Sequence, residues 1–208
     1  MEYQKAAGVV IGECQTALDK VDAEKTQAFI ELVTNVGKVF FIGVGRVKLE
    51  LEAIAKRFVH LGIDAHIVGD INEPAMTERD VLIVGLGSGE SLIPVAIAKK
   101  AKSLGGKIVH IGSNANSTLA PIIDLMIRIP VQTKLYLDDE IKSTQPMSSL
   151  FEQTLLLWGD AVAGMIVSQK KSAKIWRNTQ RNGHAQYQCL HRLGRSDCAV
   201  HSYGLGTE

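Results

Sequence analysis

One short segment combines the residue types that hold a phosphate group. It is the run Gly85-Leu86-Gly87-Ser88-Gly89-Glu90-Ser91, which follows an apolar stretch and precedes a helical pattern. Glycines let backbone N–H groups turn toward one point, and the start of a helix adds unpaired N–H groups with a partial positive charge. Ser88 and Ser91 add hydroxyl donors. The segment is therefore expected to bind a phosphate dianion, although a strand-to-helix turn with a serine cap would use the same residues.

The elements around this segment alternate between short apolar runs and helical patterns. Buried parallel strands are predicted at residues 38–45, 65–70, 81–87, 107–113 and 125–130. Helices are predicted at residues 3–18, 22–36, 47–61, 91–104, 117–122 and 149–167. Asp22 is a plausible cap for the second helix. This alternation is typical of an α/β fold with one doubly wound parallel five-stranded sheet flanked by helices, whose ligands bind in the loops after the strands.

The composition is that of a globular protein with one domain of ordinary size. Hydrophobic residues make up 46% of the 208 residues, and 23 Lys and Arg balance 22 Asp and Glu. This charge balance argues against nucleic acid as the main partner. The three cysteines do not form a disulfide framework, the N-terminus lacks a secretion signal, and no run of about 18 apolar residues indicates a membrane span. We therefore expect a soluble cytoplasmic protein with no membrane partner.

Three regions are expected along the chain. Residues 1–36 form N-terminal helices packed on the domain, residues 37–168 form the α/β domain, and residues 169–208 form a tail that is poorly ordered or lies on a neighbour. The predicted helix at 149–167 is apolar over too broad a surface for one exposed face, and burial against another subunit explains it. We expect a homo-oligomer, either a dimer or a tetramer.

Several motifs, in this order, resemble the sugar isomerase (SIS) domain family. Gly43-Val44-Gly45-Arg46 resembles its Gly-x-Gly-Arg-Ser turn after the first strand, and His60-Leu61-Gly62 resembles the end of the next helix. Ser88-Gly89-Glu90-Ser91 resembles its phosphate loop, usually Ser-x-Ser-Gly-Glu-Thr/Ser. Residues 145–153, Gln-Pro-Met-Ser-Ser-Leu-Phe-Glu-Gln, are close to a run with Gly in the fourth place that is typical of 6-phospho-3-hexuloisomerases in this family. The resemblance covers about residues 5–188.

The resemblance implies an SIS-type domain that binds a phosphorylated sugar and interconverts 3-hexulose 6-phosphate and fructose 6-phosphate. A proton then moves between adjacent carbons through an enediol. This chemistry needs a base near the carbon, a donor near the oxygens and a clamp for the phosphate. It requires no metal and no organic cofactor. The alternative is a non-catalytic or regulatory SIS protein that binds a phosphosugar.

The resemblance also suggests catalytic residues. Glu152 is the candidate base, because a carboxylate on a mostly apolar helix would have a raised pKa, but it could instead be capped or ion-paired. His60 is the candidate for acid–base work on the oxygens or for ring opening, or else a helix-end histidine bonded to carbonyls. His184 lies in His-Ala-Gln-Tyr-Gln, which faintly resembles the family's terminal His-Ala-Asn-Leu-Glu, and it could complete a neighbour's site.

The expected substrate-binding residues follow three different strands. They are Gly45, Arg46, Ser88, Gly89, Glu90, Ser91, Ser113 and Asn114. Arg46 could face the phosphate or pair with a carboxylate. Ser113 and Asn114 follow the fourth strand, where SIS domains also contact sugar, although the same residues could simply shape a turn.

The chain departs from the family pattern at four of these motif positions. Val47 and Lys48 replace Ser-Gly, so a hydroxyl is lost and a bulky base is added. Leu86 replaces the first serine of the phosphate loop, and Ser148 replaces a glycine. Phosphate binding through Ser88, Ser91 and the helix amides survives these changes. A protein that senses a sugar phosphate without converting it would tolerate them more easily than an enzyme.

Other functions have weaker support in the sequence. Gly43-x-Gly45 followed by Asp70 resembles a dinucleotide-binding fingerprint, but Lys48 stands where its third glycine belongs. The motif of a hydrolase nucleophile elbow and that of a P-loop kinase are both missing. Four tail residues could ligate zinc but have an uncommon spacing: Cys189, His191, Cys198 and His201.

Overall fold

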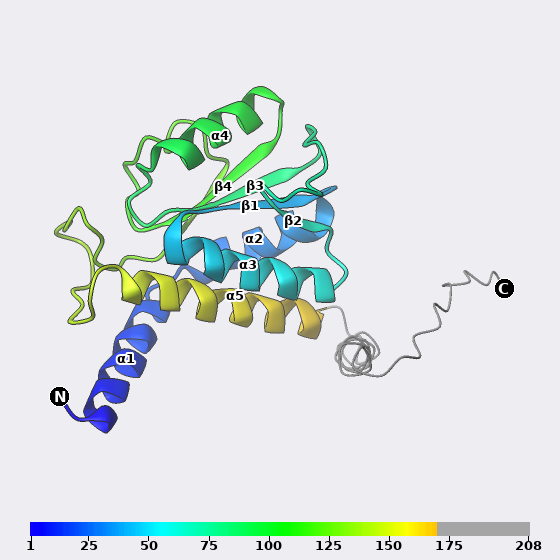
Figure 1. Ribbon diagram of the computed structural model, residues 1–208. Helices are drawn as coiled ribbons and strands as arrows, with labels where there is room; N and C mark the ends of the chain where they lie inside the picture. Colours follow the sequence, from blue (N-terminus) through cyan, green and yellow to red (C-terminus); the bar gives the residue numbers. More distant parts are fainter. Residues whose placement is uncertain (170–208) are drawn as a thin grey trace, which may run out of the picture.

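The computed structural model describes residues 1–169, which form an α/β fold around one sheet (Figure 1). The elements in chain order are α1 (Tyr3–Leu18), α2 (Ala23–Asn35), β1 (Val39–Ile42), α3 (Gly45–His60), β2 (Ala65–Ile67), β3 (Val81–Gly85), α4 (Leu92–Ser103), β4 (Lys107–Gly112), β5 (Leu125–Arg128) and α5 (Ser149–Gln169). The five strands are all parallel, in the order β2-β1-β3-β4-β5. The predicted fold class is confirmed. The tail beyond residue 169, with His184 and the four potential zinc ligands, lies outside the described residues.

The central strands are continuous apolar runs because both faces of the sheet are covered. Every residue of β1 and β3 is buried, and β1 pairs with β3 from Val39↔Val81 to Ile42↔Val84. This register brings the carboxyl ends of the two strands level. The loops that follow β1, β3 and β4 therefore meet at one edge of the sheet, where ligands of such folds bind.

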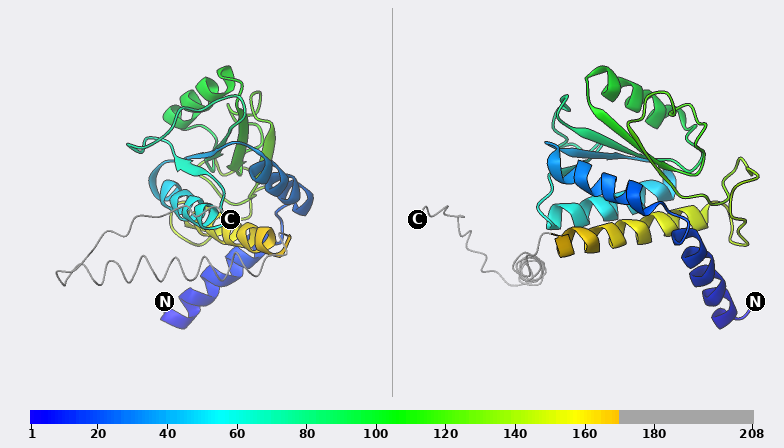
Figure 2. Two further views of the ribbon diagram at one scale, coloured as in Figure 1. Left: turned by 90° about the vertical axis from the view of Figure 1, so that its right-hand side faces the viewer. Right: turned by 180° about the vertical axis from the view of Figure 1, so that it is seen from behind.

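Helices cover the two faces of the sheet unequally (Figures 1 and 2). The α2, α3 and α5 helices lie on one face, and α1 packs on α5 and projects away from the sheet. The α4 helix covers the other face, over a smaller apolar cluster that contains Phe40, Leu82 and Ile108. The functional edge thus receives helix starts from both sides of the sheet.

The α5 helix supplies many of the buried side chains of the larger core. By length and composition it could cross a membrane, but half of its most apolar window is buried inside this fold, as in the core helix of a soluble protein. It packs closely on α3, because Gly159 has no side chain: a β-carbon there would lie 2.4 Å from Ile54 Cγ1. Packing within one chain therefore accounts for much of its apolar surface, with Leu157 left exposed.

The predicted helix at residues 117–122 is wrong. The segment forms consecutive turns instead, in which Ala120 N donates to Ser117 O and Ile122 N donates to Leu119 O. Pro121 has no N–H group to continue a helical ladder, which explains why the turns do not extend into a helix. The other predicted helices and strands are present, with ends that differ by a few residues.

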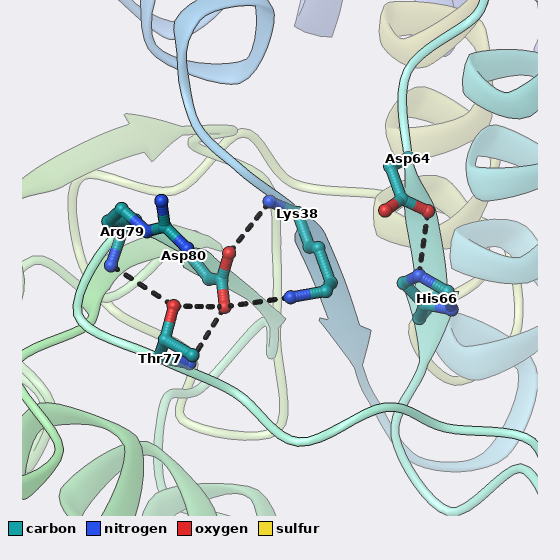
Figure 3. Close-up of polar contacts among 6 residues, drawn as sticks. All are labelled: Lys38, Asp64, His66, Thr77, Arg79 and Asp80. Atoms are coloured by element: carbon teal, nitrogen blue, oxygen red, sulfur yellow. Dashed lines mark hydrogen bonds and ion pairs between the residues drawn. The ribbon is translucent and has the colours of Figure 1, made fainter.

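The amino-terminal edge of the sheet is tied together by one carboxylate (Figure 3). Asp80 precedes β3 and is buried. It accepts hydrogen bonds from Lys38 N at 2.8 Å, Thr77 N at 2.7 Å and Thr77 Oγ1 at 2.8 Å, and Lys38 Nζ lies 3.5 Å away. Although burial opposes it, these donors lower the pKa of Asp80. The carboxylate therefore joins the starts of β1 and β3.

Candidate active site

The predicted phosphate loop joins β3 to α4 and is held from below by the residues after β4. Ser113 N and Asn114 N donate to Gly87 O at 2.9 and 3.2 Å, and Asn114 Nδ2 donates to Ser88 O at 3.2 Å. Both side chains are buried. These contacts show the turn-shaping role expected for Ser113 and Asn114, and their contact with the sugar stays a prediction.

Gly89 gives the loop a conformation that other residues rarely adopt. Its φ is +72°, and a β-carbon there would lie 2.3 Å from Ser117 Cβ. The backbone therefore passes directly over Ser117 before α4 begins. Ser91 occupies the N-cap of α4 without a side-chain cap hydrogen bond, so the alternative of a simple serine cap is not what the structure shows.

Glu90 braces the loop rather than lining it. Its carboxylate accepts hydrogen bonds from Thr118 N at 2.9 Å and Thr118 Oγ1 at 2.5 Å. These hydrogen bonds lower the pKa of Glu90. The ionised group is thereby turned toward residue 118, and its predicted part in binding the substrate stays a prediction.

Arg46 and Glu152 form an ion pair at the same edge. Arg46 Nη1 lies 2.9 Å from Glu152 Oε2 and donates to Ser149 Oγ at 3.3 Å. The Glu152 side chain is 13% exposed, whereas that of Arg46 is 54% exposed. Of the two expectations for Arg46, the structure therefore shows pairing with a carboxylate. Gly45 starts α3 with a φ of +58°, which turns the chain from β1 into the helix that carries Arg46.

The ion pair and the phosphate loop are neighbours. A β-carbon at Gly87 would lie 3.6 Å from the ring of Phe151, the residue before Glu152. A phosphate on the loop would therefore place the remainder of its molecule near the first turn of α5. Two of the three groups needed for an enediol isomerisation, a phosphate clamp and a carboxylate, meet at one edge of the sheet.

Three of the four departures from the family pattern are directed away from this site. Lys48 Nζ lies 3.1 Å from Glu52 on the surface of α3, so its charge is directed along the helix. Val47 packs beside Gly85, where a β-carbon would meet its Cγ1 at 3.1 Å. The Leu86 side chain is buried in the core under α4. Val47 and Leu86 are thus accommodated by packing, and Lys48 by an ion pair on the surface.

Two carboxylates near the site escaped the sequence reasoning. Glu50 follows Arg46 by one helical turn, and burial raises its pKa, with Arg46 opposing and Glu152 adding to the shift. Glu13 on α1 accepts hydrogen bonds from Ser143 Oγ at 2.6 Å and Thr144 N at 2.9 Å, with further bonds from the side chains of Thr144 and Gln145. Although burial opposes it, these donors lower the pKa of Glu13 to about 2.

His60 is not brought to Glu152 within one chain. It ends α3, whereas Arg46 lies at the start of that helix, and the rise of an α-helix separates them by about 20 Å. Burial lowers the pKa of His60, and Lys56 and Arg57 lower it further. Its predicted role, like that of His184, stays a prediction. Within residues 1–169, no group of three or more His, Cys, Asp or Glu side chains could hold a metal ion.

Comparison with known proteins agrees with this geometry. The family model for the SIS domain matches residues 32–158. A 3-hexulose-6-phosphate isomerase of Bacillus subtilis is 36% identical over 170 residues, which is 82% of this chain and 92% of the relative. An enzyme of the same name from Mycobacterium gastri is 36% identical over 143 residues, covering 69% of this chain and 71% of its own.

The fold agrees with a solved relative as well. A crystal structure of a Methanococcus jannaschii protein, described as inferring a molecular function of 3-hexulose-6-phosphate isomerase, superposes with a TM-score of 0.69 at 28% identity. The superposition covers 80% of this chain and 92% of the other. The resemblance predicted from the phosphate loop and from residues 145–153 is confirmed. The chain belongs to the SIS domain family.

Proposed function

We propose that this protein is a sugar-phosphate isomerase that interconverts 3-hexulose 6-phosphate and fructose 6-phosphate through an enediol. The observation that carries the proposal is the Arg46–Glu152 pair, with its 2.9 Å contact, beside the glycine-rich loop at the start of α4. The relatives named 3-hexulose-6-phosphate isomerase, aligned over most of the chain, support the same substrate.

The phosphate is held by the loop and helix start. Ser88 and Ser91 supply hydroxyl donors, and the first N–H groups of α4 supply the positive end of the helix dipole. This clamp fixes the distance between the phosphate and the reacting carbons. Binding energy from the remote phosphate is thereby used to orient the carbon–hydrogen bond toward Glu152.

Glu152 then moves the proton between neighbouring carbons. In the forward direction its carboxylate removes the proton from C2 of 3-hexulose 6-phosphate, while the C3 carbonyl oxygen gains a proton to give the enediol. The C2 hydroxyl next loses its proton, and Glu152 returns the first proton to C3. The product is fructose 6-phosphate, and no atom is gained or lost. Arg46 holds the carboxylate in the orientation this transfer needs.

The donor for the substrate oxygens has two candidate sources. Glu50 belongs to the same chain, and burial raises its pKa, which favours the protonated form that a donor needs. His60 would have to come from a second copy, since it is a helix length away within one chain, and His184 is the further candidate that could complete a neighbour's site. A dimer or tetramer is the proposed state. The exposed Leu92, Ile93 and Met147 near the loop and the start of α5 support it.

The test is an assay of the purified protein, coupled to detection of fructose 6-phosphate and started with 3-hexulose 6-phosphate. Turnover that disappears in Glu152→Gln while fructose 6-phosphate still binds establishes both the reaction and the base. Stabilisation by a phosphosugar without turnover favours the alternative of a regulatory SIS protein. If the protein shows neither turnover nor stabilisation, the proposed function is refuted. Light scattering at micromolar concentration checks the assembly, and a monomer would contradict it.

A further inference from the structure

A buried histidine supports the phosphate loop from beneath. His110 lies on β4, on the face covered by α4, and its side chain is fully buried. Its Nε2 lies 2.9 Å from the carbonyl oxygen of Leu86, the first residue after β3. A carbonyl oxygen only accepts hydrogen bonds, so Nε2 must carry the proton. The first residue of the loop, Leu86, therefore accepts a hydrogen bond from the Nε2–H tautomer of His110.

Two glycines provide the space for this ring. A β-carbon at Gly112 would lie 2.3 Å from His110 Nε2 and 2.4 Å from Leu86 O. A β-carbon at Gly89 would lie 3.1 Å from His110 Cε1 and still closer to Ser117. The imidazole thus lies between the two ends of the loop segment 86–89 and touches the strand beside it. The ring therefore limits how closely the loop segment 86–89 can approach β4.

Polar atoms without partners gather at the same place. Within residues 1–169, the buried atoms His110 Nδ1, Ser113 Oγ and Ser117 Oγ make no hydrogen bond. All three belong to residues that touch the loop or hold it, through Leu86, Gly87 or Gly89. Buried polar atoms are normally paired, so three exceptions in residues that contact one loop call for an explanation.

We propose, as a consequence of the proposed function, that His110 is a positioning residue that shapes the phosphate loop, and that phosphate affinity falls in mild acid when this ring gains a second proton. His110 acts through the Leu86 carbonyl and does not touch the substrate. The second proton would sit on Nδ1, which makes no hydrogen bond to any of the described residues. The loop would have to move to accommodate the new charge.

The direction of this pH effect follows from the surroundings of the ring. Burial lowers the pKa of His110 below its ordinary value of 6.5, while the Leu86 carbonyl and the nearby Glu90 raise it. Glu90 is the one charged group acting on the ring from the described part of the chain, and it is itself held by Thr118. The neutral form of the ring is therefore favoured, and protonating it takes a lower pH than for an ordinary histidine.

Two substitutions separate the effect of the His110 hydrogen bond from the effect of the size of its side chain. His110→Gln keeps an N–H donor near the position of Nε2 and removes the titration, whereas His110→Leu keeps similar bulk and removes the donor. The control is Thr26→Val, which removes a buried hydroxyl that bonds Trp158 and Asp22 far from the loop. Circular dichroism confirms folding. KM and kcat, and the dissociation constants of fructose 6-phosphate and inorganic phosphate, are measured from pH 5.5 to 8.

The expected result is a larger loss of binding than of chemistry. His110→Leu should raise KM and both dissociation constants about tenfold, since one hydrogen bond of the binding loop is removed, and should lower kcat by a smaller factor. His110→Gln should bind like the wild type at pH 8 but lose less affinity at pH 5.5. Phosphate itself titrates near pH 6, so the difference between the two proteins isolates the ring.

Three results overturn the inference. The first is unchanged binding and an unchanged pH profile in both His110 variants of an active wild type, which leaves the proposed isomerase intact. The second is equal weakening in Thr26→Val, which would make the effect one of general stability. The third comes from nitrogen NMR, which detects the tautomer even if His110→Leu fails to fold: a proton on Nδ1 alone at pH 7 contradicts the geometry. A wild type that binds no phosphosugar removes the proposed function and this inference together.

Discussion

The two edges of the sheet treat their buried polar groups in opposite ways. At the amino-terminal edge, Asp80 is saturated by donors from residues 38 and 77, so nothing is left for a ligand. At the carboxyl-terminal edge, His110, Ser113 and Ser117 keep buried atoms without partners in the described chain. These side chains are buried at both edges, so burial alone does not mark the site. What marks it is polar capacity that the fold leaves unused.

The largest effect is expected from Glu152→Gln, because only the carboxyl-terminal edge is expected to carry out catalysis. Loss of the proposed base should lower kcat by about 1,000-fold, within the range that general acid–base groups contribute. The dissociation constant of fructose 6-phosphate should change little. Steady-state kinetics and calorimetry provide the two values. Unchanged kcat would move the chemistry to another carboxylate, with Glu50 the next to replace.

The matching change at the other edge is Asp80→Ala. It leaves the backbone N–H groups of residues 38 and 77 buried without their acceptor, and it should cost about 3 kcal/mol of unfolding free energy. Activity per folded molecule should stay within about twofold. Urea denaturation and kinetics of the same samples test this. An Asp80→Ala protein of normal stability but poor activity would show that the amino-terminal edge serves function rather than stability.

Glu13→Gln tests whether a carboxylate with many hydrogen-bond donors near the site contributes to stability, as Asp80 is expected to do. The substitution weakens the hydrogen bonds to residues 143–145 and should cost about 1.5 kcal/mol at pH 7. The Glu13 pKa is lowered from 4.5 to about 2, so its contribution is present above pH 4.5 and is lost as the pH falls toward 2. Urea titrations at pH 7 and pH 3 should show the stability difference from wild type shrinking. A constant difference would exclude this ionised state as the cause.

The smallest effect is expected from Thr118→Val, which removes the exposed hydroxyl that holds Glu90. The backbone N–H of residue 118 still donates to the carboxylate. KM should rise by less than about twofold, and unfolding free energy should change by less than about 0.5 kcal/mol. A tenfold rise in KM would show that the direction of the Glu90 charge matters more to the site than the buried groups beneath it.

Much of the fold is predictable because its signals are local. The apolar runs that became β1, β3 and β4, and the glycine-rich loop after β3, are continuous in the sequence. The site is only partly predictable. Whether Arg46 would face phosphate or a carboxylate depended on how α5 docks on α3, and Glu13 bonds residues about 130 positions away. No periodicity reports such distant pairings, and His110 reads as an ordinary strand residue until Leu86 lies beside it.

The contact between Gly159 and Ile54 carries a consequence for protein engineering. It fixes the separation of α3 and α5, and these helices carry the two partners of the Arg46–Glu152 pair. A single methyl group at residue 159, about 10 Å along the helix from Glu152, would act as a wedge that changes the distance between two charges. Catalytic geometry in this protein can therefore be adjusted from an apolar position that no substrate reaches. Mutational libraries confined to the pocket would miss that position.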